Sequence, residues 1–286
     1  MEIRRTPILH TVDELRQWSR EQRNNGGNTI GLVPTMGALH AGHASLIRAS
    51  HETCGFTAVS IFVNPTQFGP NEDFTRYPRT FDADCALAQA EGADVIFAPS
   101  VEELYPAGAA TFVEVEGLGS RLDGQSRPSH FRGVATVVTK LFIAAEPDKA
   151  FFGQKDGAQV AVIRRMTTDL RLATEIVVCP TVREPDGLAM SSRNIYLGPA
   201  ERAQSLTLSR SLRQVESLVA KGERRSDALI AAAREIFSSE PSVHEDYIAV
   251  VNWATLKPVE IAEPGSLFAV AAYVGSTRLI DNAILT

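Results

Sequence analysis

The sequence predicts an α/β fold, a Rossmann-like, doubly wound parallel sheet followed by a second, smaller α+β domain at the C-terminus. Over the first two-thirds of the chain, short apolar segments rich in β-branched residues alternate with segments of helical period. Beyond about residue 185, two helical segments precede three strand-like segments, an order typical of an α+β domain. A length of 286 residues suits two domains. We therefore expect domains at residues 1–184 and 185–286.

The first domain is expected to contain strands that are buried on both faces of the sheet. Its strand-like segments read as unbroken apolar runs, which is typical of parallel sheets covered by helices. The predicted strands are 29–34, 56–63, 93–98, 150–152 and 176–179, and the predicted helices are 43–53, 82–91, 134–145 and 159–170. In such folds ligands bind beyond the carboxyl ends of the strands.

The second domain follows a turn-rich connection at residues 180–187. Helical period predicts helices at 199–221 and 226–238, and Gly222 is suited to end the first of them. Strands are predicted at 247–251, 267–273 and 277–280.

Composition excludes several classes of protein. Hydrophobic residues make up 44% and charged residues 22%, which is ordinary for a folded domain and not for a disordered chain, coiled coil or fibre. The net charge of -6 provides no basic field for nucleic acid, although local geometry can still bind a small anion. Three dispersed cysteines argue against a disulfide framework. Without a signal-like N-terminus or an apolar run of about 18 residues, we expect no membrane partner and a cytoplasmic location.

The most informative segment is PTMGALHAGH, residues 34–43, which runs from the first predicted strand into a helix. Its glycines permit tight turns, and the first amides of the helix are expected to point into the crevice where anions bind. His40 and His43 can share one side and donate hydrogen bonds to developing negative charge. An isolated H-x-x-H pair is more often incidental or part of a zinc site. Zinc needs further ligands, and no Cys/His cluster supplies them.

Two further segments contain groups suited to phosphates. FFGQKDGAQ, residues 151–159, is another strand-to-helix junction, where Lys155 can reach a phosphate and Asp156 can accept from a ribose hydroxyl or cap the helix. MSSRN, residues 190–194, lies in the turn-rich connection. Its two hydroxyls and the guanidinium of Arg193 can close over a triphosphate. Each segment alone is commonly a plain surface feature.

A fourth segment, FVNPTQF at residues 62–68, follows the second predicted strand. Asn64 and Gln67 offer amide donors to a carboxylate or hydroxyl without adding charge. The turn-rich residues 69–78 that follow could form a lid.

These segments together resemble a known family. The first resembles the HxGH signature of the nucleotidylyltransferase superfamily, and the third resembles its mobile KMSKS-type loop, with serine and arginine in place of lysine. The whole set, with YPRT at 77–80, RPSHFRG at 127–133 and TVREPDGLAMSSRN at 181–194, resembles the pantothenate synthetase (pantoate–β-alanine ligase) family over essentially the entire chain.

The resemblance implies an enzyme of pantothenate biosynthesis that condenses (R)-pantoate with β-alanine through a pantoyl-adenylate, releasing AMP and pyrophosphate. ATP is the implied co-substrate, with Mg²⁺ held through the ATP phosphates and no metal-ligating residues in the protein. Residues 1–184 would bind ATP and pantoate, residues 185–286 would close over the site, and the protein would be a homodimer.

The resemblance also assigns residues to roles. The implied catalytic residues are His43, His40, Lys155, Ser191, Ser192 and Arg193. The implied nucleotide-binding residues are Pro34, Thr35, Met36, Gly37, Ala38, Leu39, His40, Ala41, Gly42, His43, Gly153, Gln154, Lys155, Asp156, Val182, Met190, Ser191, Ser192 and Arg193. The implied substrate-binding residues are Asn64, Gln67, Gln159, Tyr77, Arg127 and His130.

The sequence departs from the family pattern near Lys155. Gln154 replaces a usual glutamate, and Gly157 and Ala158 replace an aromatic and a polar residue. Because glycine is a poor helix former, Gly157 is expected to loosen the start of that helix.

Three alternatives remain at the level of sequence. Another HxGH nucleotidylyltransferase with a different small acceptor would need extra Lys or Arg at the second substrate. A non-catalytic nucleotide sensor would be expected to have lost His40, His43 or Lys155. A zinc hydrolase would use the H-x-x-H pair.

Overall fold

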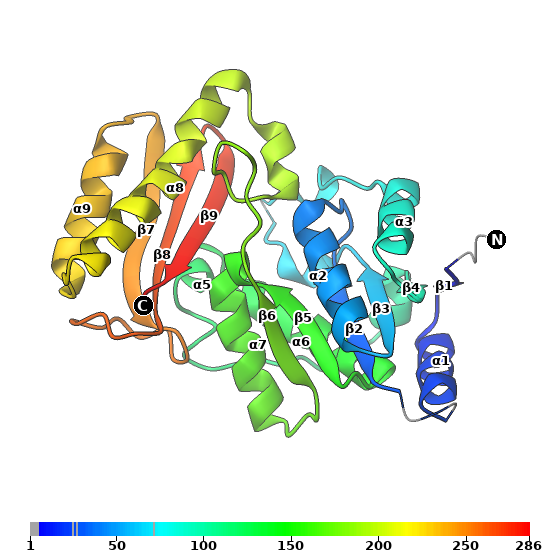
Figure 1. Ribbon diagram of the computed structural model, residues 1–286. Helices are drawn as coiled ribbons and strands as arrows, with labels where there is room; N and C mark the ends of the chain where they lie inside the picture. The colour runs from blue at the N-terminus through cyan, green and yellow to red at the C-terminus, as the bar shows by residue number, and fades with distance from the viewer. Residues whose placement is uncertain (1–5, 25, 27, 71) are drawn as a thin grey trace.

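The computed structural model describes residues 6–24, 26, 28–70 and 72–286, and its first part is built on a six-stranded sheet (Figure 1). The strand order is β1-β4-β3-β2-β5-β6, and every neighbouring pair is parallel. The strands are β1 (Ile8–Leu9), β2 (Ile30–Thr35), β3 (Phe56–Ile61), β4 (Val95–Phe97), β5 (Lys149–Gly153) and β6 (Glu175–Cys179). The predicted parallel sheet is confirmed, and only the two-residue edge strand β1 is additional.

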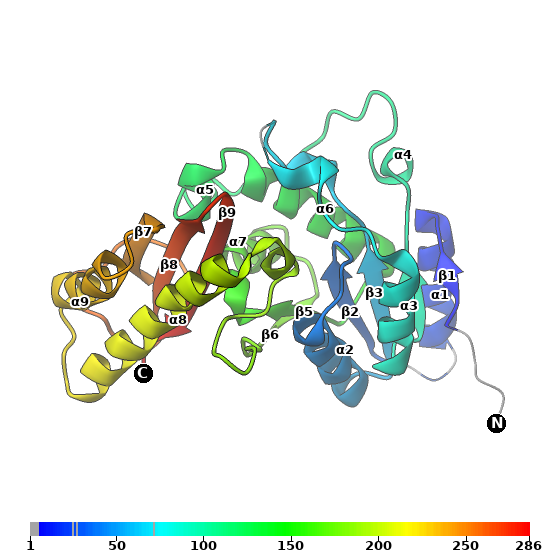
Figure 2. The ribbon, with the colours of Figure 1, turned by 90° about the horizontal axis from the view of Figure 1, so that it is seen from above.

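Helices cover both faces of this sheet, as a doubly wound fold requires (Figure 2). α1 (Val12–Asn24), α6 (His130–Ala145) and α7 (Gly157–Asp169) pack in the core on one face, and α2 (Ala41–Thr53) and α3 (Phe81–Ala90) pack on the other. Within β2, Leu32 joins the first core and its neighbour Val33 joins the second. This two-sided burial is why the strands read as continuous apolar runs.

One helix is absent from the sequence prediction, and one begins a full turn earlier than predicted. α1 was not predicted, because its apolar residues are only Val12, Leu15 and Trp18; these recur every three residues, and Leu15 is fully buried. α6 begins at His130 rather than at residue 134, so that its first turn includes His130, which lines the cleft described below.

The C-terminal part is the predicted α+β arrangement. α8 (Pro199–Ala220) and α9 (Ser226–Ser238) pack on an antiparallel sheet of order β7-β8-β9, formed by β7 (Val243–Asn252), β8 (Ser266–Val274) and β9 (Thr277–Ile284). The other face of this sheet packs against the first part of the chain. Leu267 and Ala269 of β8 belong to the same apolar core as α6 and α7. The division at residues 184 and 185 therefore stays a prediction.

The topology explains why distant motifs meet. The chain passes from β2 to β3 on one side of the sheet, whereas β5 and β6 lie on the other side of β2. β2 and β5 are thus neighbours at the point where the strand order reverses, and ligands bind at such points. Residues 34–43 include the end of β2 and residues 151–159 include the end of β5, so both segments reach one crevice.

Short helical turns connect these elements. They are η1 (Pro65–Gln67), η2 (Asp73–Thr75), α4 (Val101–Leu104), α5 (Asp123–Ser126), η3 (Gln154–Asp156) and η4 (Ser192–Tyr196). Among the described residues, no helix combines the length and apolar character needed to cross a bilayer.

Candidate active site

A cleft of about 220 Å³ opens at the carboxyl ends of the central strands and brings most of the predicted residues together. All four segments that the sequence singled out contribute residues to its wall. The predicted residues on its wall are Pro34, Thr35, Met36, His40, Gly42, His43, Asn64, Gln67, Tyr77, Arg127, His130, Gly153, Lys155, Asp156, Gln159, Val182, Met190, Ser191, Ser192 and Arg193.

Five residues predicted to bind nucleotide do not line this cleft: Gly37, Ala38, Leu39, Ala41 and Gln154. The amides of Ala38 and Leu39 are bound by the carboxylate of Asp84 on α3. Ala41 is exposed. The Gln154 side chain instead donates to Asn282 of β9, at 3.4 Å.

The two histidines occupy defined positions at the start of α2. His40 is the N-cap residue, and its Nδ1 accepts the amide N–H of Gly42 at 3.1 Å. Nδ1 of His43 accepts the amide N–H of His40 at 3.3 Å. Because a backbone amide can only donate, each neutral ring must carry its proton on Nε2. The ring centroids lie 4.1 Å apart.

Both imidazoles are held neutral by their surroundings. Burial, assisted by the positive charge of Lys155, lowers the pKa of His40 to about 4. Burial also lowers the pKa of His43 to about 3, with further contributions from His40 and Lys155. Near neutral pH the pair therefore offers two Nε2–H donors and no positive charge.

One amide at the helix terminus differs from expectation. The first amides of this helix are expected from the sequence to point into the crevice, but the Gly42 amide donates to Nδ1 of His40. N-capping by His40 thus occupies one of the donors that the helix terminus could offer to an anion.

Lys155 lies in η3, and hydrogen bonds connect this turn to the C-terminal sheet. Nδ2 of Asn282 donates to the carbonyl oxygens of Gln154 and Lys155 at 2.9 and 2.8 Å. Nε1 of Trp253 donates to the carbonyl of Gly157 at 2.8 Å. A β-carbon on Gly157 would lie 3.2 Å from Asn282 Nδ2, so glycine permits this close approach. Gly157 was expected to loosen the helix start; the structure instead ties this start to the C-terminal sheet.

Segment 69–80, which includes the predicted lid at residues 69–78, contacts the Ser192–Arg193 loop. Nε and Nη2 of Arg193 donate to the two carboxylate oxygens of Asp73 at 2.9 and 3.0 Å. The Tyr77 hydroxyl lies 3.1 Å from the Ser192 hydroxyl. Burial alone would raise the pKa of Asp73, but hydrogen bonds and charge from Arg193 hold it below its usual range.

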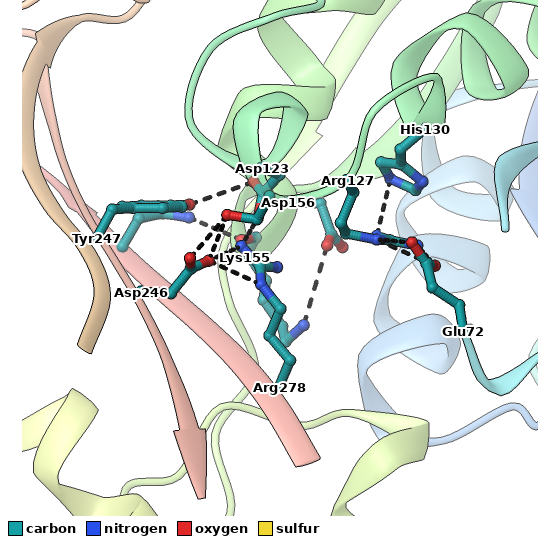
Figure 3. Close-up of polar contacts among 11 residues, drawn as sticks. Glu72, Asp123, Arg127, His130, Lys155, Asp156, Asp246, Tyr247 and Arg278 are labelled. Atoms are coloured by element: carbon teal, nitrogen blue, oxygen red, sulfur yellow. Dashed lines mark hydrogen bonds and ion pairs between the residues drawn. The ribbon is translucent and has the colours of Figure 1, made fainter. Parts of the chain in front are cut away.

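Arg127 and His130 form a second polar cluster, with Glu72 (Figure 3). Arg127 is ion-paired with Glu72, and its Nη1 lies 3.1 Å from Nε2 of His130. Nδ1 of His130 lies 2.9 Å from the carbonyl oxygen of Gln67, so it is the protonated nitrogen. Burial, with the charge of Arg127, lowers the pKa of His130 to about 4.

Figure 3 also shows a polar cluster on the other side of Lys155 and Asp156, and this cluster is largely shielded from solvent. Nη2 of Arg278 on β9 lies 2.8 Å from Asp123 of α5 and 2.7 Å from Asp246 of β7. The Tyr247 hydroxyl donates to Asp123 at 3.2 Å. This cluster fixes α5, the turn that immediately precedes Arg127, against the C-terminal sheet.

The uncharged end of the cleft combines amides with an apolar wall. Nδ2 of Asn64 donates to Gln67 Oε1 and to the carbonyl of Gly133, both at 3.1 Å, and both side chains are buried. The wall consists of Phe62, Val134, Val137, Val138 and Leu141. The sequence did not mark the apolar α6 residues of this wall as part of the site, although the apolar run of this helix was visible.

The chain is similar over almost its whole length to one family of known proteins. The family model described as pantoate-beta-alanine ligase matches residues 7–284. The chain is 58% identical to the pantothenate synthetase of Acidobacterium capsulatum, covering 96% of this chain and 95% of that protein. It is 52% identical to the pantothenate synthetase of Acetivibrio thermocellus, covering 97% and 99%.

The chain belongs to the pantoate–β-alanine ligase family. Its activity is accordingly the ATP-dependent condensation of pantoate with β-alanine. Family membership decides against the zinc hydrolase, the nucleotide sensor and the nucleotidylyltransferase with another acceptor.

Solved structures of this family share the architecture described above. The crystal structure of pantothenate synthetase from Thermus thermophilus superposes with a TM-score of 0.92 at 43% identity, covering 98% of this chain and 99% of that chain. The pantoate–β-alanine ligase from Francisella tularensis has a TM-score of 0.78 at 33% identity, covering 98% and 97%, and is described as complexed with beta-gamma ATP and β-alanine.

Proposed function

We propose that this pantoate–β-alanine ligase works through a pantoyl-adenylate formed in the cleft between β2 and β5. An oxygen of the pantoate carboxylate attacks the α-phosphorus of ATP, and the bond to the β-phosphate oxygen breaks, so pyrophosphate leaves. The amine of β-alanine then attacks the acyl carbon, and AMP leaves with the oxygen that pantoate supplied. The amine loses one proton as the amide bond forms.

The observation that supports this proposal is the meeting of His40, His43 and Lys155 at the ends of neighbouring strands. Two Nε2–H donors and one ammonium group suit the charge that develops on phosphate oxygens, where positioning and electrostatics supply most of the catalysis. Neutral imidazoles can donate to phosphate without being titrated near neutral pH.

Ser191, Ser192 and Arg193 would complete the grip on the triphosphate. Arg193 is bound to Asp73 in this structure, and a phosphate would replace that carboxylate with the same two-pronged geometry. Gly153 and Asp156 would hold the ribose, while Val182 and Met190 would flank the adenine. Residues 185–286 would thereby close over a site built mainly by residues 1–184.

Mg²⁺ would be carried by the triphosphate and would neutralise part of its charge. Mg²⁺ prefers phosphate oxygens, water and one or two carboxylates in octahedral geometry. Among the described residues there is no group of three His, Cys, Asp or Glu side chains placed to hold a metal ion. The residues present fit an ion that arrives with ATP.

Pantoate matches the uncharged end of the cleft. Its hydroxyls and carboxylate would bind the amides of Asn64, Gln67 and Gln159, and its two methyl groups would pack on the apolar wall of Phe62 and α6. Gln67 would also face β-alanine. Tyr77, Arg127 and His130 would help to close the site, Tyr77 through its contact with Ser192 and Arg127 through its ion pair with Glu72 of segment 69–80.

The family resemblance also supports a homodimer in the cytoplasm. Light scattering of the purified protein tests the assembly: a mass of twice the chain supports the dimer, and a single-chain mass contradicts it.

The two half-reactions can be separated in one assay. ATP and pantoate are supplied with and without β-alanine, and pyrophosphate and AMP are followed independently. We expect pyrophosphate release to require pantoate, and AMP release to require both substrates. Pyrophosphate that forms without pantoate, or a reaction that never yields AMP, would count against the adenylate route.

A further inference from the structure

A buried carboxylate on α3, Asp84, faces the loop that joins β2 to the two histidines. Its side chain is 2% exposed and lies outside the cleft wall. Oδ2 accepts the amide N–H of Ala38 at 2.9 Å, and Oδ1 accepts that of Leu39 at 2.8 Å. The Thr80 hydroxyl donates to Oδ1 at 3.0 Å. Within the described residues, the partners of this carboxylate are therefore two amides and one hydroxyl.

The loop needs this carboxylate because of its backbone conformation. Gly37 has φ +80° and Ala38 has φ +49°, so two successive residues are left-handed, which is uncommon for alanine. Two successive amides then point toward α3, away from any backbone acceptor in a helix or strand. Unpaired buried amides are costly, and hydrogen bonds to a charged acceptor are stronger than neutral ones.

The next peptide unit controls the tautomer of a histidine. Asp84 holds the amide of Leu39, and the following amide, that of His40, donates to Nδ1 of His43. His40 itself is the N-cap of α2. A displacement of the Leu39 peptide would therefore move the donor that keeps the His43 proton on Nε2.

We propose that Asp84 is a positioning residue for adenylation: it holds the loop 36–40 so that His40 and His43 present Nε2–H to the phosphates. This inference rests on the phosphate-binding role proposed above for the two histidines. Asp84 also anchors the end of segment 69–80, because it accepts the Thr80 hydroxyl. Three residues before Thr80 in this segment, Tyr77 contacts the Ser192 hydroxyl.

The test variant is Asp84→Asn, which is nearly isosteric but leaves one oxygen for three donors. Its NH₂ group would face a backbone N–H, so at least one amide of the loop loses its acceptor. We expect single-turnover pyrophosphate release to slow by about 10- to 100-fold, with a smaller change in ATP binding, since misplacement of catalytic groups by about 1 Å has effects of that size.

The matched control is Asp148→Asn. Asp148 also accepts a backbone amide of β2, that of Ile30 at 2.7 Å, but at the opposite end of the strand. We expect it to lower the melting temperature and leave the rate of pyrophosphate release unchanged.

A spectroscopic readout separates positioning from general destabilisation. Long-range ¹H–¹⁵N correlation spectra of histidine-labelled protein report which ring nitrogen is protonated. We expect Nε2–H signals for His40 and His43 in the parent and in Asp148→Asn, and a mixed or altered tautomer for His43 in Asp84→Asn. Should Asp84→Asn keep both the parental ring signals and the parental rate, the inference is overturned.

A second variant covers the case in which Asp84→Asn does not fold. A β-carbon on Gly37 would lie 3.0 Å from Asp84 Oδ2, so Gly37→Ala pushes the loop and carboxylate apart from the other side. A folded Gly37→Ala variant with parental ring signals and rate would overturn the inference equally. The phosphate-binding role proposed for the histidines is tested separately: a folded His43→Ala variant that adenylates at the parental rate would contradict it.

Discussion

At the scale of single residues, the site depends on which imidazole nitrogen carries the proton. Nδ1 of His40 and Nδ1 of His43 are both occupied by backbone donors, so each Nε2–H is free to bind phosphate. Both rings are neutral near pH 7, because burial lowers the pKa of His40 to about 4 and that of His43 to about 3. The pair can therefore donate hydrogen bonds without carrying charge, and Lys155 lies in the same cleft as an adjacent positive charge.

A prediction at this scale concerns His43→Ala. Removing one preorganised donor to a developing oxyanion costs about 10²- to 10³-fold in rate in comparable sites. We expect pantoate-dependent pyrophosphate release, measured by rapid quench, to slow by about that factor while the near-ultraviolet circular dichroism is retained.

The matched control for that variant is His244→Ala, at an exposed position of β7. It should leave the rate unchanged. An unaltered rate in folded His43→Ala would remove His43 from the mechanism.

The sequence pointed to residues that line the cleft and missed those that hold them in place. His40, His43 and Lys155 belong to short segments whose residue types state their chemistry. Asp84 and Asn282 act on backbone groups of segments 45 or more residues away in sequence, so no local pattern marks them. The Gly42 amide was misjudged for a related reason: capping by His40 depends on a rotamer, which the sequence does not specify.

At the scale of elements, the cleft is assembled from loops that other elements hold in place. η3 carries Lys155 and is bound by β9 through Asn282, while segment 69–80 is bound to η4 through Asp73 and Arg193. Strands and most helices could be predicted, because period and apolar content are local properties. The contacts between loops could not, because they depend on which strand ends become neighbours.

A prediction at this scale concerns Asn282→Asp. The change replaces two donated hydrogen bonds with a carboxylate that faces two carbonyl oxygens, so the turn that carries Lys155 should shift. We expect the rate of adenylation to fall by about 10-fold or more, consistent with misplaced catalytic groups. Asn252→Asp is the control, because Oδ1 of Asn252 only accepts hydrogen bonds, which aspartate can still accept. Equal rates in both variants would contradict the prediction.

A further element-scale prediction concerns Asp73→Asn. If a triphosphate replaces Asp73 on Arg193, weakening that ion pair should strengthen ATP binding. A half-buried pair of this kind is worth about 1 kcal/mol, so the dissociation constant for a non-hydrolysable ATP analogue should fall about fivefold by calorimetry. Asp82→Asn, an exposed position on α3, controls for the lost negative charge. Weaker binding in Asp73→Asn alone would mean that Asp73 orients Arg193 for the nucleotide.

At the scale of the whole molecule, the two sheets share an apolar core and a partly buried polar cluster. Leu267 and Ala269 of β8 pack with α6 and α7, and Arg278 joins β7 and α5. The α/β and α+β parts could be recognised from the order of elements. The packing of the two parts against each other could not be predicted. It depends on the second face of the C-terminal sheet, whose apolar residues look like those of any strand.

The pH dependence of stability follows from the buried histidines. His40, His43 and His130 have pKa values of about 4, 3 and 4, below the ordinary 6.5, so the unfolded chain binds more protons between those values. Their contribution to stability is complete above about pH 6.5 and is lost as the pH falls toward 4, by at most about 1.4 kcal/mol per pH unit for each group. We expect the melting temperature to fall across this range, and less steeply in His43→Ala. A melting temperature independent of pH in this range would contradict the prediction.

Transfer of an oxygen isotope from pantoate to AMP is expected if the pantoate carboxylate attacks the α-phosphorus of ATP, as proposed above. Pantoate labelled with oxygen-18 in its carboxylate is converted with ATP and β-alanine, and the products are analysed by mass spectrometry. We expect one labelled oxygen in AMP and none in pyrophosphate. Label in pyrophosphate or inorganic phosphate, with AMP unlabelled, would place the attack at another phosphorus and contradict the proposal.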